Sequence, residues 1–299
     1  MSPPVDDYGR PVTHLRVSVT ARCNLRCPYC HHEGASSGAD NDLPMEFFCA
    51  AVRAAAAVGI RRALKITGGE PLLRDDLERL VSCGVEAGFG DVSLVTNGTL
   101  LDARRARSLA AAGLARLNIG CDAVTSSVLP KTYERVRTAV EAALSAGLAP
   151  VKLNVVLMRG INDGEVDRLL KVSAEKGVVV QFIELVEADE AEFYRRHHID
   201  LGALESELVG RATHVERRDL QNRTVVRLAD GATAEFVRPS HPGFCARCRK
   251  IRLTHDGRVK PCLLSEHGTV KFSGEESLLE AVRMRRPYNG ADGGGRRKT

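Results

Sequence analysis

The sequence ALKITGGEPLLRDDLERLVSCGVEA, residues 63–87, contains one complete unit of the pattern that organises the first 185 residues. Residues 63–67 form a short apolar run, residues 67–71 form a Gly-rich turn, and residues 75–87 place Leu and Val at helical spacing. This succession predicts a β-strand and an α-helix that packs back against it.

Six such units follow one another along the chain. The predicted strands cover residues 14–19, 63–67, 91–95, 116–119, 151–158 and 178–185, and the predicted helices cover residues 45–58, 75–87, 102–112, 132–146 and 165–176. Alternating strands and helices predict parallel strands joined by right-handed crossovers. An open doubly wound sheet and a (β/α) barrel both satisfy this pattern.

The loops after the strands favour the barrel. Polar or Gly-rich residues follow five of the predicted strands, at positions 23–30, 67–71, 96–98, 122 and 162–163. Barrel enzymes assemble their active sites from the loops at the C-terminal ends of the strands. The predicted fold class is therefore α/β, a partial six-unit (β/α) barrel similar to a TIM barrel.

The pattern changes near residue 186. A charged stretch at 187–198 and one predicted helix at 201–209 precede two Asp-Gly dipeptides, Asp230-Gly231 and Asp256-Gly257, which predict β-hairpins. We expect two domains, the barrel at residues 1–185 and a smaller α+β C-terminal portion at residues 186–299. The chain ends in a Gly-rich, basic tail that contains Gly293, Gly294 and Gly295.

The composition is that of a folded protein, with 43% hydrophobic and 27% charged residues and a net charge of +5. No apolar run approaches the roughly 18 residues that span a bilayer, and the first residues carry no secretory signal pattern, so we expect a cytoplasmic protein. An odd count of nine cysteines in a reducing compartment makes disulfides improbable and favours metal binding or chemistry. Three isolated cysteines are expected to be small core residues: Cys49, Cys83 and Cys121.

A first group of cysteines, Cys23, Cys27 and Cys30, follows the first predicted strand at the spacing C-x3-C-x2-C. A structural zinc site takes four ligands, and His31 and His32 lie too close to Cys30 in sequence to complete one well. A [4Fe–4S] cluster held by three thiolates keeps one iron open to another ligand. The sequence CNLRCPYC at 23–30 resembles the signature of the radical S-adenosylmethionine (SAM) superfamily. That resemblance implies a cluster whose open iron binds SAM and supplies the electron that generates a 5′-deoxyadenosyl radical.

A second group, Cys245, Cys248 and Cys262, lies on a predicted hairpin that is rich in Lys and Arg. A zinc half-site with His241 or His255 is the alternative interpretation. The segment GFCARCRKIRLTHDGRVKPC at 243–262, together with GGEPLLR at 68–74 and MRGIND at 158–163, resembles GTP 3′,8-cyclases, the molybdenum cofactor biosynthesis protein A family. The shorter archaeal-type members are the most similar.

The resemblance implies a radical SAM lyase with two [4Fe–4S] clusters. It converts GTP to 3′,8-cyclo-7,8-dihydro-GTP in the first step of molybdenum cofactor (molybdopterin) biosynthesis, with no acid or base catalyst of its own. The residues implied to surround SAM are Tyr29, Gly69, Gly120 and Val186, and those implied to line the GTP pocket are Arg16, Lys65, Thr96, Lys152, Lys250 and Arg252. The partners implied are an electron donor and the next enzyme of the pathway, with a homodimer left open and no membrane or nucleic acid. The two clusters are expected to face each other across the barrel mouth.

The sequence departs from the family pattern at several positions. Gly120-Cys121-Asp122 stands where the family has Ser-Leu-Asp, Lys250 and Gln181 stand where Arg is common, and four residues follow the Gly tail. These changes leave open another radical SAM enzyme with an auxiliary cluster, acting on a peptide or another small molecule. A zinc-containing nucleic-acid-binding module is disfavoured by the 4% aromatic content and the absence of Trp.

Overall fold

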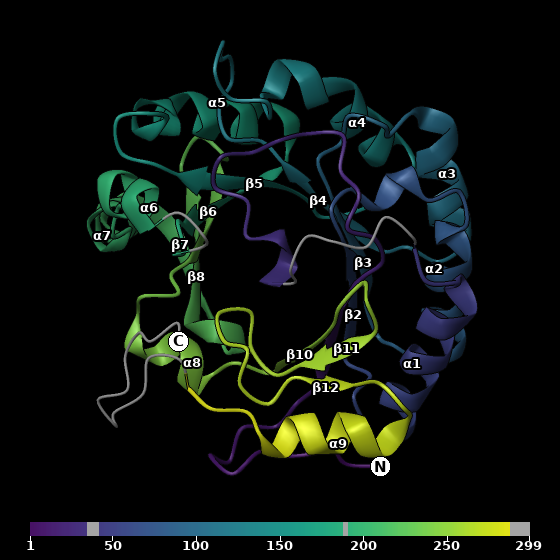
Figure 1. The fold of residues 1–299 in the computed structure, drawn as a ribbon. Helices are drawn as coiled ribbons and strands as arrows, with labels where there is room; N and C mark the ends of the chain where they lie inside the picture. Colours follow the sequence, from purple (N-terminus) through teal and green to yellow (C-terminus); the bar gives the residue numbers. More distant parts are fainter. Residues whose placement is uncertain (35–41, 188–190, 288–299) are drawn as a thin grey trace.

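The fold is built on a single sheet that curves into an incomplete barrel. The computed structural model describes residues 1–34, 42–187 and 191–287, and Figure 1 looks down the barrel axis. Twelve strands form the sheet in the order β12-β11-β10-β1-β2-β3-β4-β5-β6-β9-β8-β7. The two end strands, β12 and β7, are not paired with each other, which confirms the predicted partial barrel. No helix in the described ranges has the length and apolar character required to cross a membrane.

The first six strands and five helices follow the predicted units closely. The strands are β1 (His14–Ser18), β2 (Ala63–Thr67), β3 (Val92–Thr96), β4 (Arg116–Gly120), β5 (Val151–Leu157) and β6 (Val179–Glu184). The helices outside them are α1 (Met45–Ala57), α2 (Leu77–Glu86), α3 (Ala103–Ala111), α4 (Tyr133–Ser145) and α5 (Val166–Lys176). All six strands are parallel to their neighbours, as the βα alternation predicts.

The C-terminal part extends the barrel at both edges. Its strands are β7 (Ala212–Arg218), β8 (Arg223–Leu228), β9 (Thr233–Val237), β10 (Lys250–Leu253), β11 (Arg258–Lys260) and β12 (Val270–Lys271). Strand β10 pairs in parallel with β1, whereas β9 pairs in parallel with β6. Both predicted Asp-Gly hairpins are present, between β8 and β9 and between β10 and β11.

The remaining helices lie in the C-terminal part, where the sequence pattern predicts only one of the four. They are α6 (Ala191–His197), α7 (Gly202–Gly210), α8 (Pro242–Ala246) and α9 (Glu275–Arg283). Helix α9 runs along the outside of β10 and β11 in Figure 1. The Gly-rich tail, Gly293 to Gly295, lies outside the described residues.

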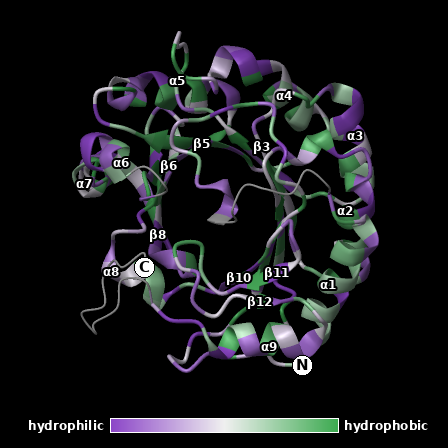
Figure 2. Ribbon diagram, in the orientation of Figure 1, coloured by the Kyte–Doolittle hydropathy of each residue, from purple (hydrophilic) through white to green (hydrophobic). Residues whose placement is uncertain are grey.

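The strand register explains why the barrel interior is polar. Neighbouring strands place Arg16 beside both Arg252 and Lys65, and Asn118 beside Lys152. Alternate residues of these strands, such as Leu15 and Val17, are buried against the helices, which turn their apolar faces inward in Figure 2. Because side chains alternate between the faces of a strand, the same register that buries the apolar set outside directs the polar set into the barrel.

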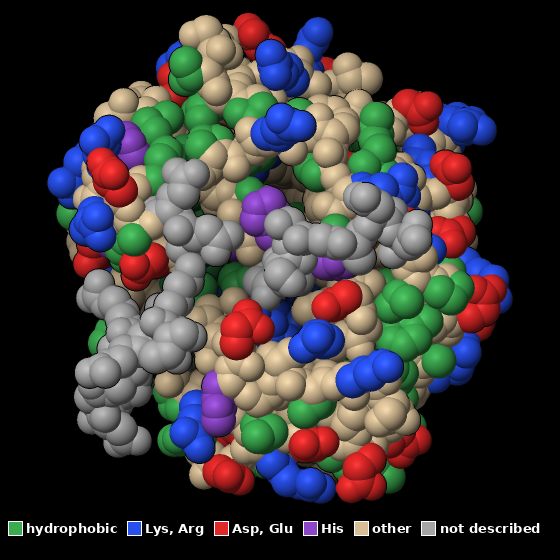
Figure 3. All heavy atoms as spheres, in the orientation of Figure 1, with side chains coloured by type: hydrophobic (Ala, Val, Ile, Leu, Met, Phe, Trp, Pro, Cys, Tyr) green, Lys and Arg blue, Asp and Glu red, His purple; other side chains and the backbone are tan. Residues whose placement is uncertain are grey.

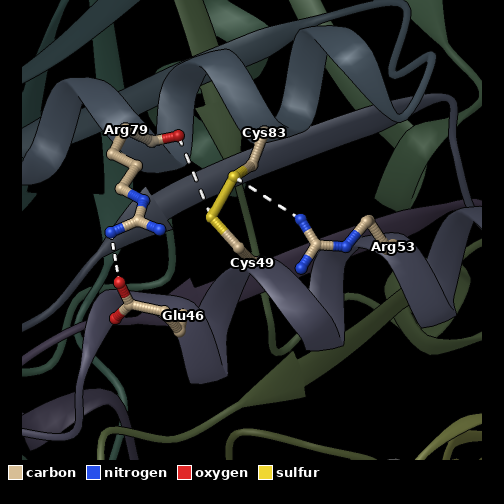
Figure 4. Close-up of a disulfide and its surroundings, with 5 residues drawn as sticks. All are labelled: Glu46, Cys49, Arg53, Arg79 and Cys83. Carbon is tan, nitrogen blue, oxygen red and sulfur yellow. Dashed lines mark hydrogen bonds and ion pairs between the residues drawn. A yellow bond between two sulfur atoms is a disulfide. The ribbon is translucent and has the colours of Figure 1, made fainter.

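Two cysteines form a disulfide, contrary to the expectation from the composition. Cys49 on α1 and Cys83 on α2 are joined by a bond of 2.07 Å, with their Cα atoms 5.7 Å apart (Figure 4). Both were predicted to be small core thiols, and the prediction is wrong because α1 packs directly against α2 and brings the two cysteines into bonding range. The third, Cys121, is fully buried as a free thiol, as predicted.

Candidate active site

The first cysteine loop leaves the C-terminal end of β1. Cys23, Cys27 and Cys30 are free thiols, and two of them are exposed. The amide of Leu25 points at the Cys23 sulfur at 3.4 Å, and the Cys30 amide donates to the Cys27 carbonyl at 3.1 Å. Amides directed at sulfur are a common feature of iron–sulfur ligand loops. Three free cysteines on one loop therefore fit a cluster with one open iron.

The GGEP loop after β2 packs backbone to backbone against the segment before Cys23. A Cβ built on Gly69 would lie 2.2 Å from the Arg22 carbonyl oxygen, so only glycine fits there. The Gly69 amide donates to Thr20 and the Glu70 amide donates to Arg22. These contacts place Gly69, a predicted SAM residue, beside the cysteine loop.

The Glu70 side chain is fully buried within the protein. Its carboxylate accepts the Thr96 hydroxyl at 2.6 Å, the Asn97 amide at 2.7 Å and the Leu72 amide at 3.0 Å. The Glu70 side chain therefore ties its own loop, after β2, to the loop after β3. Thr96, predicted to line the GTP pocket, is 3% exposed and its hydroxyl donates to Glu70.

The other three predicted SAM residues lie at or near a buried pair formed by Tyr29 and Asp122. The hydroxyl of Tyr29 donates to Asp122, which follows β4, and burial together with the Asp122 charge raises the pKa of Tyr29. Gly120 ends β4 two residues before Asp122. Val186 follows β6 directly after Leu185, which packs in the same small apolar cluster as Tyr29. All four predicted SAM residues are thus on the side of the barrel where the strands end.

The second cysteine group lies at the opposite ends of the strands. Cys245 and Cys248 precede β10, which runs parallel to β1, and Cys262 follows β11, which is antiparallel to β10. All three are therefore near the start of β1, whereas the first group follows its end. Strand β1 has five residues and spans roughly 16 Å. The expected arrangement across one mouth is wrong, because parallel pairing of β1 with β10 separates the two groups along the barrel.

The donor set of the second group also fits a three-thiolate cluster. The three cysteines are free thiols, and the Leu264 amide points at the Cys262 sulfur at 3.5 Å. Burial raises the pKa of Cys248, but the charges of Arg285 and Lys250 outweigh it and bring that pKa below its ordinary value. His241, the alternative zinc ligand, uses Nδ1 to accept the Gly243 amide at the start of α8.

A buried Arg–Asp–Arg group that the sequence pattern did not reveal holds this second loop. Asp6 accepts from Arg10 at 2.8 Å and from Arg285 at 2.9 Å. Arg10 then donates to the Cys245 carbonyl and Arg285 to the Cys248 carbonyl, at 2.9 and 2.7 Å. The three charged residues are each no more than 6% exposed. Because Asp6 and Arg285 lie 279 positions apart, no local motif could signal the group.

Between the two cysteine groups, Arg16 and Arg252 lie side by side on β1 and β10. Both guanidinium groups bind the carboxylate of Glu33, Arg16 at 2.7 Å and Arg252 at 2.8 Å, and Thr67 donates to the same carboxylate at 3.1 Å. Glu33 belongs to the short 3-10 turn His32–Gly34, seen in purple at the centre of the ring in Figure 1. The two predicted GTP residues therefore share one buried counter-ion supplied by the cysteine loop.

The other predicted GTP residues line the same interior. Lys65 donates to Asn118 at 2.8 Å, Lys250 donates to Gln221 at 2.7 Å, and Lys152 forms an ion pair with Glu235. Lys250 and Arg252 both point inward, as strand alternation predicted.

Arg223 on β8 is a further basic residue of the interior, not identified from the sequence. It donates to Gln221 at 2.7 Å, to Glu235 at 3.1 Å and to Gln181 at 3.4 Å. The family commonly has Arg at position 181, where this chain has Gln. The guanidinium of Arg223, on the neighbouring hairpin, contacts the Gln181 side chain.

The interior carries more positive than negative charge. The six basic side chains named above lie with two carboxylates, Glu33 and Glu235, and Glu235 also pairs with Arg218 in the described structure. Burial and the neighbouring cations lower the pKa of Lys65 and of Lys250 well below the ordinary lysine value. An anion bound among these groups would relieve that cost, because it favours their charged forms. On the face shown in Figure 3, by contrast, charges of both signs are interspersed.

Two families match consecutive parts of the chain, the radical SAM superfamily over residues 17–172 and Molybdenum Cofactor Synthesis C over residues 178–275. The "Probable GTP 3′,8-cyclase" of Methanosarcina mazei is 41% identical over 305 residues, covering 95% of this chain and 89% of that protein. The protein with the same name from Methanothermobacter thermautotrophicus is 37% identical and is covered over 98% of its length.

Solved structures agree on the fold. Streptococcus suis SuiB bound to S-adenosylmethionine superposes with a TM-score of 0.64 at 16% identity, over 84% of this chain and 60% of that longer chain. The structure titled "Native anSMEcpe with bound AdoMet" gives a TM-score of 0.59 at 17% identity, covering 91% and 80% of the two chains.

The partial barrel and the cysteine loop after β1 define a radical SAM enzyme. Enzymes of this class bind SAM at a [4Fe–4S] cluster. The chain belongs to the GTP 3′,8-cyclase family of that superfamily, whose members are lyases that carry a second [4Fe–4S] cluster.

Proposed function

We propose that this protein converts GTP to 3′,8-cyclo-7,8-dihydro-GTP, the first step of molybdenum cofactor biosynthesis. The observation that carries the proposal is the buried excess of positive charge between two three-cysteine loops, because it suits a triphosphate held between two clusters. When bound at the first loop, the cluster and SAM supply the radical. The chain's own residues hold the cofactor and the substrate and exclude water.

The residues divide into four sets: two groups of cluster ligands, the basic residues between them, and the SAM pocket. Cys23, Cys27 and Cys30 hold the SAM cluster, and Cys245, Cys248 and Cys262 hold the cluster that meets the purine. Between them, the basic residues that bind GTP are Arg16, Lys65, Lys152, Lys250 and Arg252, to which Arg223 is added. Tyr29, Gly69, Gly120 and Val186 form the SAM pocket. The division into a barrel at 1–185 and a C-terminal domain at 186–299 assigns one cluster to each part.

The activity is tested by anaerobic reconstitution followed by incubation with SAM, dithionite and GTP. We expect about eight irons per chain, 5′-deoxyadenosine and a cyclised nucleotide. Cleavage of SAM with GTP left intact would contradict the substrate and retain the superfamily. Zinc in place of iron would contradict both the GTP substrate and the radical SAM assignment.

Replacing Arg252 by Ala is expected to weaken GTP binding by about tenfold to a hundredfold, because a charge-assisted contact to phosphate is lost. The measurement is anaerobic calorimetry of GTP binding to the reconstituted protein. Arg258→Ala is the matched control on the same hairpin, since Arg258 is 62% exposed and pairs with Asp256. Equal losses in the two variants would argue against a specific phosphate contact at position 252.

Replacing Arg223 by Met tests the added basic residue. Arg223 and Lys250 both donate to the side-chain oxygen of Gln221. The substitution therefore removes the charge of Arg223 and loosens the residue that holds the Lys250 ammonium. We expect a higher KM for GTP and an unchanged rate of SAM cleavage in the absence of GTP. Arg227→Met, an exposed position on the same strand, is the control. A wild-type KM for Arg223→Met would exclude it from the GTP site.

The reaction also needs an external electron donor of low potential, because each SAM cleavage consumes one electron. The cyclised product is the substrate of the next enzyme of the pathway. The sequence leaves a homodimer open, and light scattering of the reconstituted protein would determine the oligomeric state.

A further inference from the structure

Position 120, at the end of β4, has no side chain, and the space that one would occupy is filled by Lys131. A Cβ built on Gly120 would lie 2.6 Å from Cδ of Lys131 and 3.2 Å from its Nζ. The contact is made by the long side chain of a residue eleven positions away. Gly120 and Lys131 are therefore a complementary pair, in which the absence of one side chain makes room for the other.

The backbone around Lys131 is fixed beside the strand end. The Asp122 amide donates to the Lys131 carbonyl at 2.8 Å, and the Tyr133 amide donates to Ala123 at 2.8 Å. A parallel bridge between Ala123 and Thr132 continues this pairing. These backbone contacts hold the end of the loop between β4 and α4, which contains Lys131, beside the end of β4.

The ammonium group of Lys131 lies at the cysteine loop. Its Nζ is 3.4 Å from Oδ2 of Asp122 and 4.8 Å from the ring centroid of Tyr29, the residue directly before Cys30. The side chain is only 15% exposed. The ion pair with the fully buried Asp122 carboxylate favours the charged form of this lysine.

An ammonium has three N–H donors, and the ion pair with Asp122 occupies one direction. SAM carries two cationic groups, its own ammonium and its sulfonium, which repel Lys131. The ribose and the adenine are neutral at physiological pH. The carboxylate is the one anionic group of SAM, so it is the group that a buried lysine at this place attracts.

We propose that Lys131 binds SAM through the carboxylate of the cofactor and supplies the polar contact that position 120 lacks. This assignment rests on the proposed function, because it assumes that the protein binds SAM, and it adds a residue to the SAM site. Asp122 positions Lys131, and Tyr29 packs against its ammonium.

The first experiment compares SAM with decarboxylated SAM by anaerobic calorimetry on the reconstituted holoenzyme. Lys131→Met should weaken SAM binding by about tenfold to a hundredfold and leave the affinity for decarboxylated SAM unchanged. Lys171→Met, which alters a lysine that is 78% exposed, is the control and should change neither. Unchanged SAM affinity, or an equal loss for both ligands, would overturn the assignment.

The second experiment tests the pairing with Gly120. Gly120→Ser alone should weaken SAM binding, because the new side chain displaces Lys131. In Gly120→Ser/Lys131→Met the loss should be smaller than the product of the two single losses, since the hydroxyl enters the space that the lysine has left. Strictly multiplicative losses would show that the two positions act independently and would sink the proposal.

Iron content and the absorption of the reconstituted clusters establish that each variant is folded and loaded. Failure of the proposed function is recognised separately, because it leaves GTP unconverted while SAM still binds and is cleaved. Failure of the Lys131 assignment leaves GTP conversion intact and the SAM affinity of Lys131→Met at the wild-type value.

Discussion

Replacing Glu33 by Ala is expected to lower the stability of the ligand-free protein by about 3–5 kcal/mol and to tighten GTP binding roughly tenfold. Glu33 is 7% exposed and neutralises both Arg16 and Arg252. Its removal leaves two buried cations without their shared counter-ion. The triphosphate of GTP can take the place of the Glu33 carboxylate. In the variant, GTP binding therefore neutralises Arg16 and Arg252, which Glu33 already neutralises in the wild-type protein.

The same pair predicts how the stability difference depends on pH. Burial opposes ionisation of Glu33, but Arg16 and Arg252 outweigh it and hold its pKa well below the ordinary range. A carboxyl with a lowered pKa contributes its full stability above the unfolded-state value of about 4.5 and loses it as the pH falls toward the folded-state pKa. The difference in unfolding free energy between the wild type and Glu33→Ala should therefore be constant from pH 7 to about pH 5 and decrease below about pH 4.5.

Differential scanning calorimetry and GTP titration of the two proteins measure these effects. Glu46→Ala is the matched control, because Glu46 pairs with Arg79 in an exposed ion pair and its removal should change neither property. Glu33→Gln keeps the shape and removes the charge, so it should resemble Glu33→Ala in GTP affinity. Weaker GTP binding in both Glu33 variants would mean that the carboxylate orients the two arginines and does not compete with the phosphates.

Removing the Cys49–Cys83 disulfide by a double substitution to Ala is expected to cost about 3–4 kcal/mol of unfolding free energy. The bond closes a loop with a sequence separation of 34, which restricts the unfolded chain. It joins α1 and α2 outside the barrel, beside Arg53 and Arg79 (Figure 4), so iron content and activity should be unchanged.

Thermal unfolding with and without a reductant measures this contribution. Reductant should lower the unfolding temperature of the wild-type protein and leave that of Cys49→Ala/Cys83→Ala unchanged. Cys121→Ala, which removes a buried unpaired thiol, should keep the sensitivity to reductant. Alkylation of the denatured, cluster-free chain should modify seven cysteines, and modification of all nine would contradict the bond.

The barrel could be predicted because its information is local. Each βα unit has its own pattern of apolar residues, and the ends of its strand and helix differ from the predicted ones by at most two residues. Strand β2 has the predicted bounds, and α2 begins two residues later than predicted. The two cysteine groups were recognisable from spacing alone. Strand β7 escaped prediction because five of its seven residues are exposed, so no apolar alternation marks it.

The rest of the site depends on contacts between distant segments. Glu33 meets Arg252 across 219 positions, and the pairing of Cys49 with Cys83 follows from the packing of α1 against α2. The Glu70 carboxylate of the GGEP loop accepts three internal donors, two of them on the loop after β3, and the motif alone does not reveal them. Spacing therefore identifies which residues carry chemistry, and only the packing of the sheet decides what each of them touches.

The Asp6–Arg10–Arg285 group sets an order for maturation of the protein. The second cysteine loop is held by residues from both ends of the described chain, so its ligands reach their final positions only after residue 285 has left the ribosome. The first loop contacts Asp122, the apolar cluster that contains Leu185, and Arg252, and none of these residues belongs to the last described helix. The second cluster is thus expected to be inserted after synthesis is complete, and a chain shortened by its last helix should retain iron at one site and lose it at the other.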